Sequence, residues 1–126
     1  MSDDTAPEIT HPVARQLDAY NARDIEAFMR WWADDCQYYA FPDTLLANGA
    51  EEIRARHITR FLEPDLFGKL LSRVTVGNMV VDYETVRRTF DQGPGELDVI
   101  CMYLIENGKI AKAWFKTGTP RLHHQP

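Results

Sequence analysis

His57 is the residue of this sequence best suited to acid–base chemistry near neutral pH. It lies in the run "AEEIRARHITRFLEPDLF", where Ile53, His57 and Phe61 recur at helical spacing and therefore share one side of a helix. An imidazole on that side can act as a general acid or base in a pocket. The position also suits a hydrogen-bonded histidine with a structural role, and a facing carboxylate would favour the chemical alternative.

Three carboxylates that could face this imidazole are Asp82, Glu84 and Asp98, all in predicted strands. Side chains alternate between the two faces of a strand, so each points either into a pocket or toward solvent or a dimer contact. The adjacent Arg87 and Arg88 must point in opposite directions for the same reason. An inward Arg87 would pair with Glu84 or with a ligand carboxylate, whereas an outward Arg87 would form a salt bridge on the outer face. The sequence leaves these alternatives open.

Aromatic residues and two pairs of strand positions indicate an apolar pocket. Tyr38 and Ala40 share one face of a predicted strand, and Cys101 and Tyr103 share one face of another. Small-molecule pockets are mostly apolar, with a few directed polar groups. The residues predicted to enclose a flat apolar ligand are Tyr20, Phe28, Trp32, Tyr38, Ala40, Phe61, Cys101, Tyr103, Ala113 and Phe115.

The cysteines and histidines give no sign of a metal site. Cys36 and Cys101 lie in apolar runs with no second ligand at zinc spacing, so we interpret them as reduced core thiols of a cytoplasmic protein. The adjacent His123 and His124 near the C-terminus would make at most a weak metal site. The sequence contains no phosphate-binding loop either, and we expect no cofactor.

Composition narrows the class of protein. The chain has 126 residues and a net charge of −5, which fits one domain and argues against nucleic acid or an anionic membrane as a partner. No window approaches the roughly 20 apolar residues of a membrane span, and the start "MSDDTAPEITHP" is unlike a signal peptide. We expect a single domain over residues 1–126, with residues 1–11 and 119–126 as flexible arms.

Helices come first and strands afterwards in the predicted order of elements. Apolar spacing predicts a helix from Pro12, a second helix capped by Asp24 that runs through Trp32, and a third after Gly49 that Pro64 limits. Short strands are predicted over residues 36–41 and 45–47. Four longer strand-like runs follow over residues 70–76, 79–90, 97–105 and 109–118, separated by turn sequences. Three helices against a bent, mainly antiparallel sheet form an α+β domain.

Three segments of the chain resemble the nuclear transport factor 2-like superfamily, in its SnoaL-like and ketosteroid isomerase-like branch. "NARDIEAFMRWWADDCQYYAF" is similar to the second helix and first strand of that family, "NGAEEIRARH" to its third helix, and "MYLIENGKIAKAWF" to its last hairpin. The resemblance implies a cone-shaped roll with an interior pocket. It implies much less about activity, because this fold carries enzymes, binding proteins and transport factors.

Matching the segments without gaps implies that the ketosteroid isomerase residues are replaced. Gln16 falls where those enzymes have the tyrosine of their oxyanion hole, and Ala40 falls where they have the aspartate base. Cys101 falls where they have an aspartic acid that stays protonated because its pKa is raised. His57 falls at the position of a supporting tyrosine. An alanine cannot take a proton, so we expect no ketosteroid isomerase activity by that mechanism.

Two functions stay open on this evidence. One is a cofactor-independent isomerase, cyclase, dehydratase or hydrolase for a small apolar cyclic substrate, with His57 as the acid or base and with Gln16 and Tyr38 orienting the substrate. The other is a non-catalytic domain for ligand binding or dimerisation. Members of the superfamily that the chain resembles commonly pair through the outer face of the sheet. We expect that face to be apolar here, with Trp114, Val99 and Met102 on it, and we therefore predict a homodimer.

Overall fold

The structure is a computed structural model that describes residues 5–123, with side chains from residue 9 onward. This range holds three helices and seven strands. In chain order they are α1 (Thr5–Ala22), α2 (Ile25–Met29), β1 (Trp32–Ala40), β2 (Thr44–Asn48), α3 (Ala50–Arg60), β3 (Phe67–Val76), β4 (Met79–Phe90), β5 (Gly93–Glu106), β6 (Lys109–Thr117) and β7 (Arg121–Leu122).

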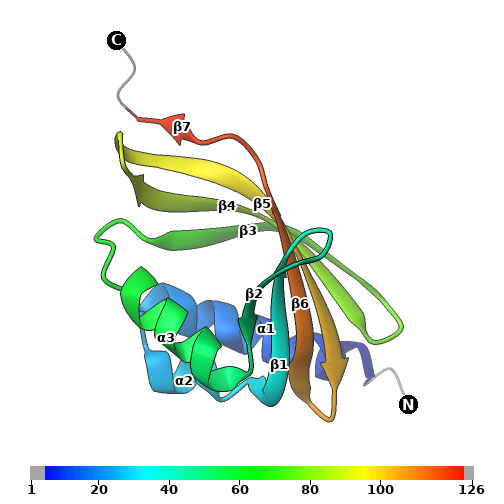
Figure 1. The fold of residues 1–126 in the computed structure, drawn as a ribbon. Helices are drawn as coiled ribbons and strands as arrows, with labels where there is room; N and C mark the ends of the chain where they lie inside the picture. Colours follow the sequence, from blue (N-terminus) through cyan, green and yellow to red (C-terminus); the bar gives the residue numbers. More distant parts are fainter. Residues whose placement is uncertain (1–4, 124–126) are drawn as a thin grey trace.

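The strands form one bent sheet whose concave side faces the helices (Figure 1). Their order is β2-β1-β6-β5-β4-β3, and β7 pairs with β5 beyond the part of β5 that β6 covers. All pairs are antiparallel except β1 with β6. The predicted α+β fold, a cone-shaped roll of three helices on a strongly bent sheet, is confirmed, and the sheet does not close into a barrel.

The turn between α1 and α2 is fastened to the segment that leads from α3 into β3. Arg23 has a positive φ of 57°, which reverses the chain after α1. Its guanidinium donates hydrogen bonds to three backbone carbonyls in residues 63–66, at 2.8–3.2 Å. Asp24 then caps α2 by accepting a hydrogen bond from the Ala27 amide at 3.1 Å. These bonds hold all three helices at one end of the concave face.

The core lies between the helices and the central strand β5. Alternate residues of β5 are buried because one face of the strand meets the helices and the pocket: Leu97, Val99, Cys101, Tyr103 and Ile105. Burying each large apolar side chain of this kind contributes roughly 1.5–3 kcal/mol to stability. The same alternation sends Asp98, Ile100, Met102 and Leu104 to the outer face.

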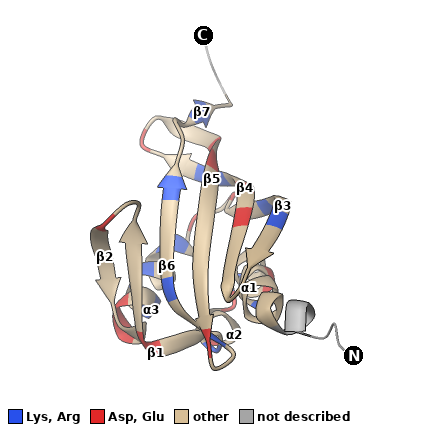
Figure 2. Ribbon diagram, turned by 90° about the vertical axis from the view of Figure 1, so that its right-hand side faces the viewer, with Lys and Arg blue, Asp and Glu red and all other residues tan. Residues whose placement is uncertain are grey.

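That outer face is apolar in its middle, and the middle of β5 carries no charged residue (Figure 2). Met102 pairs with Trp114 of β6, and Trp114 pairs with Tyr39 of β1, whose ring stacks on the indole at 6.0 Å between centroids. Val99, expected on this face, lies on the concave side instead, because it has the same parity along β5 as Cys101 and Tyr103.

Several element boundaries differ from the predictions; β3, for example, begins at Phe67 rather than at residue 70, and β5 at Gly93 rather than at residue 97. Helix α1 begins at Thr5 rather than at Pro12, which lies inside the helix. Trp32 begins β1 instead of ending α2, because it pairs with Ile110 and the preceding Trp31 carbonyl accepts a hydrogen bond from the Ile110 amide at 2.8 Å. Arg121 and Leu122, placed in a flexible arm by the sequence, form β7 against Gly95 and Glu96.

Candidate active site

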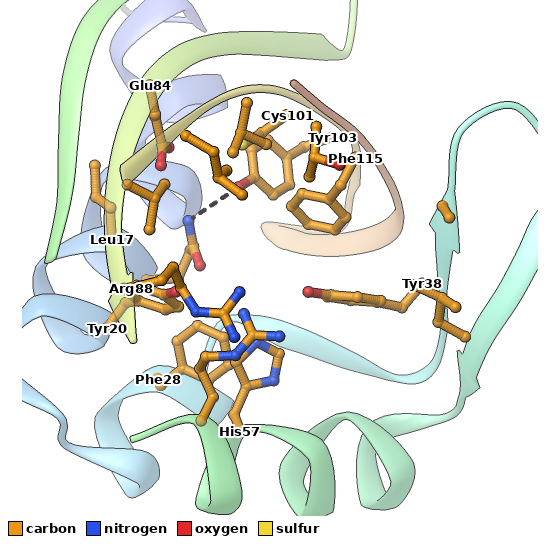
Figure 3. A pocket seen from close by; sticks show the side chains of 18 of the residues that line it. Leu17, Tyr20, Phe28, Tyr38, His57, Glu84, Arg88, Cys101, Tyr103 and Phe115 are labelled. Atoms are coloured by element: carbon orange, nitrogen blue, oxygen red, sulfur yellow. Dashed lines mark hydrogen bonds between the residues drawn. The ribbon is translucent and has the colours of Figure 1, made fainter. Parts of the chain in front are cut away.

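A pocket of about 230 Å³ lies between the concave face of the sheet and the helices (Figure 3). Helix α1 contributes three residues to its wall, α2 one and α3 two, and the strands supply the rest. The apolar and aromatic lining consists of Leu17, Tyr20, Phe28, Trp32, Tyr38, Ala40, Leu46, Val86, Leu97, Val99, Tyr103 and Phe115. The other lining residues are Gln16, His57, Arg60, Glu84, Arg88, Cys101 and Thr117.

His57 is buried on the inward side of α3, and its ring packs on Phe28 at 4.5 Å between centroids. Its Nδ1 lies 2.8 Å from the Ile53 carbonyl oxygen, so this nitrogen carries the proton and donates it. Burial, with smaller contributions from Arg60 and Arg56, lowers the pKa of His57 from 6.5 to about 4, against the raising effect of the hydrogen bond to the Ile53 carbonyl. No carboxylate is among the charges that act on it within the described residues. His57 is therefore a neutral imidazole at physiological pH.

Glu84 is the acidic residue of the pocket wall. It projects from β4 into the cavity, and its Oε2 has no hydrogen-bond partner among the described residues. Burial and the charge of nearby Asp82 raise the pKa of Glu84 from 4.5 to about 7, against smaller lowering effects of Cys101 and Arg73. The carboxyl group therefore exchanges its proton close to neutral pH. That is the property required of a general acid or base.

Asp82 lies two residues from Glu84 on the same face of β4 and is fully buried. Arg73 of β3 binds it through two hydrogen bonds, Nε to Oδ1 at 2.7 Å and Nη2 to Oδ2 at 2.9 Å. This fork satisfies the Asp82 charge, whereas Glu84 has no cation bound to it in the same way. The two carboxyl groups thus have different roles: Asp82 is structural, and its charge raises the proton affinity of Glu84.

A second set of polar groups lies at the same end of the pocket as Glu84. Gln16 of α1 donates from Nε2 to the Tyr103 hydroxyl at 3.4 Å and to the Val13 carbonyl at 3.2 Å (the bond to Tyr103 is the dashed line in Figure 3). Burial raises the pKa of Tyr103 and of Cys101 well above their ordinary values. Both stay protonated at neutral pH, so the Tyr103 hydroxyl is available as a hydrogen-bond donor while the thiol is not a nucleophile.

The opposite end of the pocket is cationic. Arg88, four residues after Glu84 on the same face of β4, extends its guanidinium between Tyr20 and Tyr38 (Figure 3). It holds Glu63 in a fork, Nε to Oε1 and Nη2 to Oε2, both at 2.8 Å. Arg60 from the end of α3 also lines the pocket, and its Nε is 3.6 Å from Glu63 Oε2.

The structure brings most of the predicted site residues together around one pocket. His57, Gln16, Tyr38 and Cys101 line the pocket, together with Tyr20, Phe28, Trp32, Ala40, Tyr103 and Phe115. Phe61 and Ala113 do not line it. Phe61 lies behind His57 at 5.9 Å between ring centroids, and Ala113 is buried where β6 pairs with both Tyr38 and Tyr103.

The open alternatives among the charged strand residues are settled by strand parity. Glu84 and Arg88 point into the pocket, while Arg87 is exposed with its guanidinium 5.1 Å from the Phe67 ring centroid. Asp98 lies on the outer face and binds Arg121 and Thr85 at 3.0 Å each. Sequence reasoning named Arg88 only as the neighbour of Arg87 and did not select Arg60. The signal for Arg60 was its position three residues after His57, on the same side of the helix.

Metal-binding groups, free thiols and membrane-spanning helices can each be examined in the described part of the chain. Residues 5–123 contain no group of three or more His, Cys, Asp or Glu side chains arranged to hold a metal ion. Cys36 and Cys101 are free thiols and both are buried. His124, part of the predicted weak metal site, lies outside the described residues. None of the helices in the described range is long and apolar enough to cross a membrane.

Comparison with known proteins identifies the family. Residues 13–113 match the SnoaL-like domain, so the chain belongs to the SnoaL-like family of the nuclear transport factor 2-like superfamily. A search of curated proteins gave no significant match.

Three solved structures illustrate the likeness of fold. An uncharacterized cystatin-fold protein from Novosphingobium aromaticivorans has a TM-score of 0.78 at 23% identity, over 85% of this chain and 96% of that chain. IdmH from Streptomyces antibioticus, described as a candidate polyketide cyclase, has a TM-score of 0.73 at 20% identity, over 86% and 91%. A candidate ketosteroid isomerase from Kribbella flavida has a TM-score of 0.75 at 13% identity, over 94% and 82%. At these identities the likeness establishes the fold alone.

Proposed function

We propose that this protein is a cofactor-independent acid–base enzyme of the isomerase or cyclase kind, acting on a small, mainly apolar cyclic carbonyl compound. The observation that carries the proposal is Glu84, a carboxyl group on the wall of an apolar pocket with a free oxygen and a pKa of about 7. Fold relatives described as candidate polyketide cyclases and ketosteroid isomerases make the same reaction class plausible.

In the proposed reaction, ionised Glu84 takes a proton from the carbon next to a carbonyl group. The C–H bonding pair becomes the carbon–carbon double bond of an enolate, and the carbonyl π pair moves onto its oxygen. Donors that could stabilise that oxygen are the hydroxyls of Tyr103 and Tyr38, both of which line the pocket and are kept protonated by burial. Protonated Glu84 then returns the proton to another carbon. In a cyclisation, the enolate carbon instead attacks a second carbonyl carbon of the same molecule, whose π pair moves onto its oxygen and takes the proton from Glu84.

The pocket volume limits the size of the substrate. Drug-sized ligands occupy pockets of roughly 300–1,000 Å³. At about 230 Å³ this cavity suits a molecule of one or two rings and is small for a four-ring steroid. Together with Ala40 in place of a base, this leads us to expect that a Δ5-3-ketosteroid is isomerised at background rates.

The proposal is tested by the exchange of hydrogen for deuterium in 2-tetralone, a two-ring ketone, followed by NMR in deuterated buffer. We expect the protein to accelerate exchange, and Glu84→Gln to lower the catalysed rate by on the order of 10²–10⁴-fold. Glu96→Gln is the matched control, since Glu96 lies on the neighbouring strand and pairs with Arg121 at the surface. Equal rates for the protein and for Glu84→Gln would refute the proposed role of Glu84.

A non-catalytic binding domain is the second candidate. It is favoured by His57, whose Nδ1 is committed to the Ile53 carbonyl and whose imidazole faces no carboxylate among the described residues. This alternative predicts that small aromatic ligands bind in the pocket and that 2-tetralone exchange stays at the buffer rate.

A further inference from the structure

We propose that Arg60 and Arg88 form a carboxylate-binding subsite, so that the ligand of this pocket is a small cyclic carboxylic acid. The inference rests on the proposed function only in taking the pocket as the substrate site. The subsite would select a carboxylic acid as the ligand and would fix the orientation of that ligand in the pocket.

This end of the pocket carries more positive than negative charge. Two guanidinium groups, from Arg60 and Arg88, share one carboxylate, that of Glu63, among the described residues. Glu63 is already fully used: both of its oxygens bind Arg88, and Oε1 also accepts the Thr89 amide at 3.1 Å. Burial would raise the pKa of Glu63, but Arg88 and the Thr89 amide outweigh it and lower the pKa, so Glu63 is ionised. One positive charge stays uncompensated.

The Arg60 guanidinium keeps hydrogen-bonding capacity beyond its contact with Glu63. Arg60 reaches Glu63 only at 3.6 Å, which is beyond a normal hydrogen bond, so the contact is ionic. A guanidinium carries five N–H donors in a planar fork, and that fork matches a carboxylate better than it matches any neutral group. Both arginine side chains are only about one-fifth exposed, at 20% and 23%. A cation held in such surroundings binds an anion more strongly than it would in bulk water.

The two arginines line the same pocket as Glu84, with Arg88 on the same strand as the acid. Glu84, Val86 and Arg88 are alternate residues on the inward face of β4, so the acid and the guanidinium start from backbone positions roughly 13 Å apart, with an apolar side chain between them. A two-ring molecule with its carboxylate on Arg60 and Arg88 would span that row. Its far ring would then lie against Glu84, where the proton transfer is proposed.

The test compares the binding of 2-naphthoate with that of its neutral analogue 2-naphthamide, measured by calorimetry. We expect the protein to bind 2-naphthoate at least 10-fold more tightly, because a paired carboxylate in a partly desolvated site is favoured over an amide. Arg60→Gln should remove most of that preference while changing the affinity for 2-naphthamide less than 2-fold. This variant leaves the Arg88–Glu63 fork in place, and folding is checked by its thermal unfolding.

Arg87→Gln is the matched control, since Arg87 is the chain neighbour of Arg88 but points to the outer face. It should leave both affinities unchanged. Equal affinity for the two probes, an unchanged preference in Arg60→Gln, or failure of 2-naphthoate to bind at millimolar concentration would each overturn the subsite. If the subsite is refuted but deuterium exchange depends on Glu84, the proposed enzyme function stands. If the protein selects the carboxylate but catalyses no exchange, the subsite stands and the proposed enzyme function is refuted.

Discussion

At the scale of single residues, Glu84 differs from the buried Asp82 and the half-buried Glu63 in lacking a bound cation. Asp82 has Arg73 and Glu63 has Arg88, whereas Glu84 meets Gly68, Cys101 and the charge of Asp82. A carboxyl group that is buried without a cation prefers its protonated form, which shifts its pKa upward. The folded protein therefore binds a proton at Glu84 over a pH range in which the unfolded chain has released it.

The first prediction concerns the pH dependence of stability. Because the folded pKa of Glu84, about 7, exceeds the ordinary value of 4.5, the stability that comes from its protonated form is fully present below pH 4.5 and is lost as the pH rises through 7. The loss is on the order of 3 kcal/mol. Glu84→Gln should remove this dependence. The free energy of unfolding of the variant should therefore increase relative to that of the unmodified protein as the pH rises. Denaturant unfolding at pH 5 and pH 8.5 measures the difference.

A second prediction concerns His57, whose folded pKa is depressed. The pKa falls from 6.5 to about 4 through burial, so the contribution of the neutral imidazole is present above pH 6.5 and is lost as the pH falls through 4. We expect the ring signals of His57 in an NMR titration to stay constant from pH 6 to 8. His57→Ala should cost about 2–4 kcal/mol, since it opens a cavity and leaves the ring contacts unmade. A His57 signal that titrates near pH 6.5 would show that a carboxylate or water reaches the ring.

At the scale of the elements, the contact of β3 with β4 controls how tightly Glu84 is enclosed. Asn21 of α1 clamps Gly68 of β3 by two reciprocal hydrogen bonds of 2.8 and 2.9 Å. A Cβ atom on Gly68 would lie 3.1 Å from Glu84 Oε1 and 3.2 Å from Leu17 Cδ1. Gly68 has no side chain, and its lack of a Cβ atom therefore leaves space for the Glu84 carboxyl group.

The third prediction follows from this close approach. Gly68→Ala should destabilise the protein by about 1 kcal/mol and alter the titration of Glu84, because the added methyl crowds the carboxyl group. Gly118→Ala is the control, since a Cβ there would make an ordinary contact of 3.5 Å with the Asp98 carbonyl. Thermal unfolding and exchange rates of both variants check the prediction. Equal effects of the two substitutions would show that the space beside Glu84 is not limiting.

Strand β4 also shows where prediction from the sequence ends. The helices, the late strands and the inward side of α3 follow from periodicity alone. In β4 both faces carry apolar residues, Val80 and Val86 on one and Val81 and Tyr83 on the other, so alternation does not reveal which acid points inward. Its register with β5, in which Asp82 pairs with Cys101 and Glu84 with Val99, decides the question. That register depends on the hairpin turn at residues 91–92, for which the run "DQGPG" allows more than one geometry.

A similar limit applies to Trp32 and to Ala40. The spacing of Trp32 after Phe28 is helical, but its pairing with β6 overrides that local preference. Ala40 was predicted to line the pocket, and it does so. The sequence offered Glu84 as one of three candidate acids on the later strands, but it did not indicate which of the three lines the pocket.

At the scale of the whole molecule, the outer face of the sheet carries a contiguous apolar row of the kind that is typical of an interface. Tyr39, Trp114, Met102 and Val81 form one cross-strand row over β1, β6, β5 and β4, and each is only half-buried in the single chain. We propose that two copies of the chain pair through this row as a symmetric homodimer. The face is on the opposite side of the sheet from the pocket, so dimerisation would leave the pocket accessible.

The fourth prediction tests that assembly. Sedimentation at micromolar concentration should show a dimer, and Met102→Lys should shift it to the monomer by placing a charge in the middle of the row. Leu62→Lys is the control, because Leu62 is 79% exposed in the segment after α3, away from the outer face. A protein that sediments as a monomer at every concentration, or equal dissociation by both substitutions, would contradict the proposed interface.

The proposed function depends on Glu84 being a carboxyl group on the pocket wall that exchanges its proton near neutral pH. The measurement that tests it most directly is an NMR titration of the side-chain carboxyl carbons in ¹³C-labelled protein, with Glu84→Gln used to assign the Glu84 signal. We expect a midpoint near 7 for Glu84. A Glu84 carboxyl that titrates at its ordinary value of 4.5 would show that it is solvated or paired with a cation, and would refute its proposed role as the acid or base.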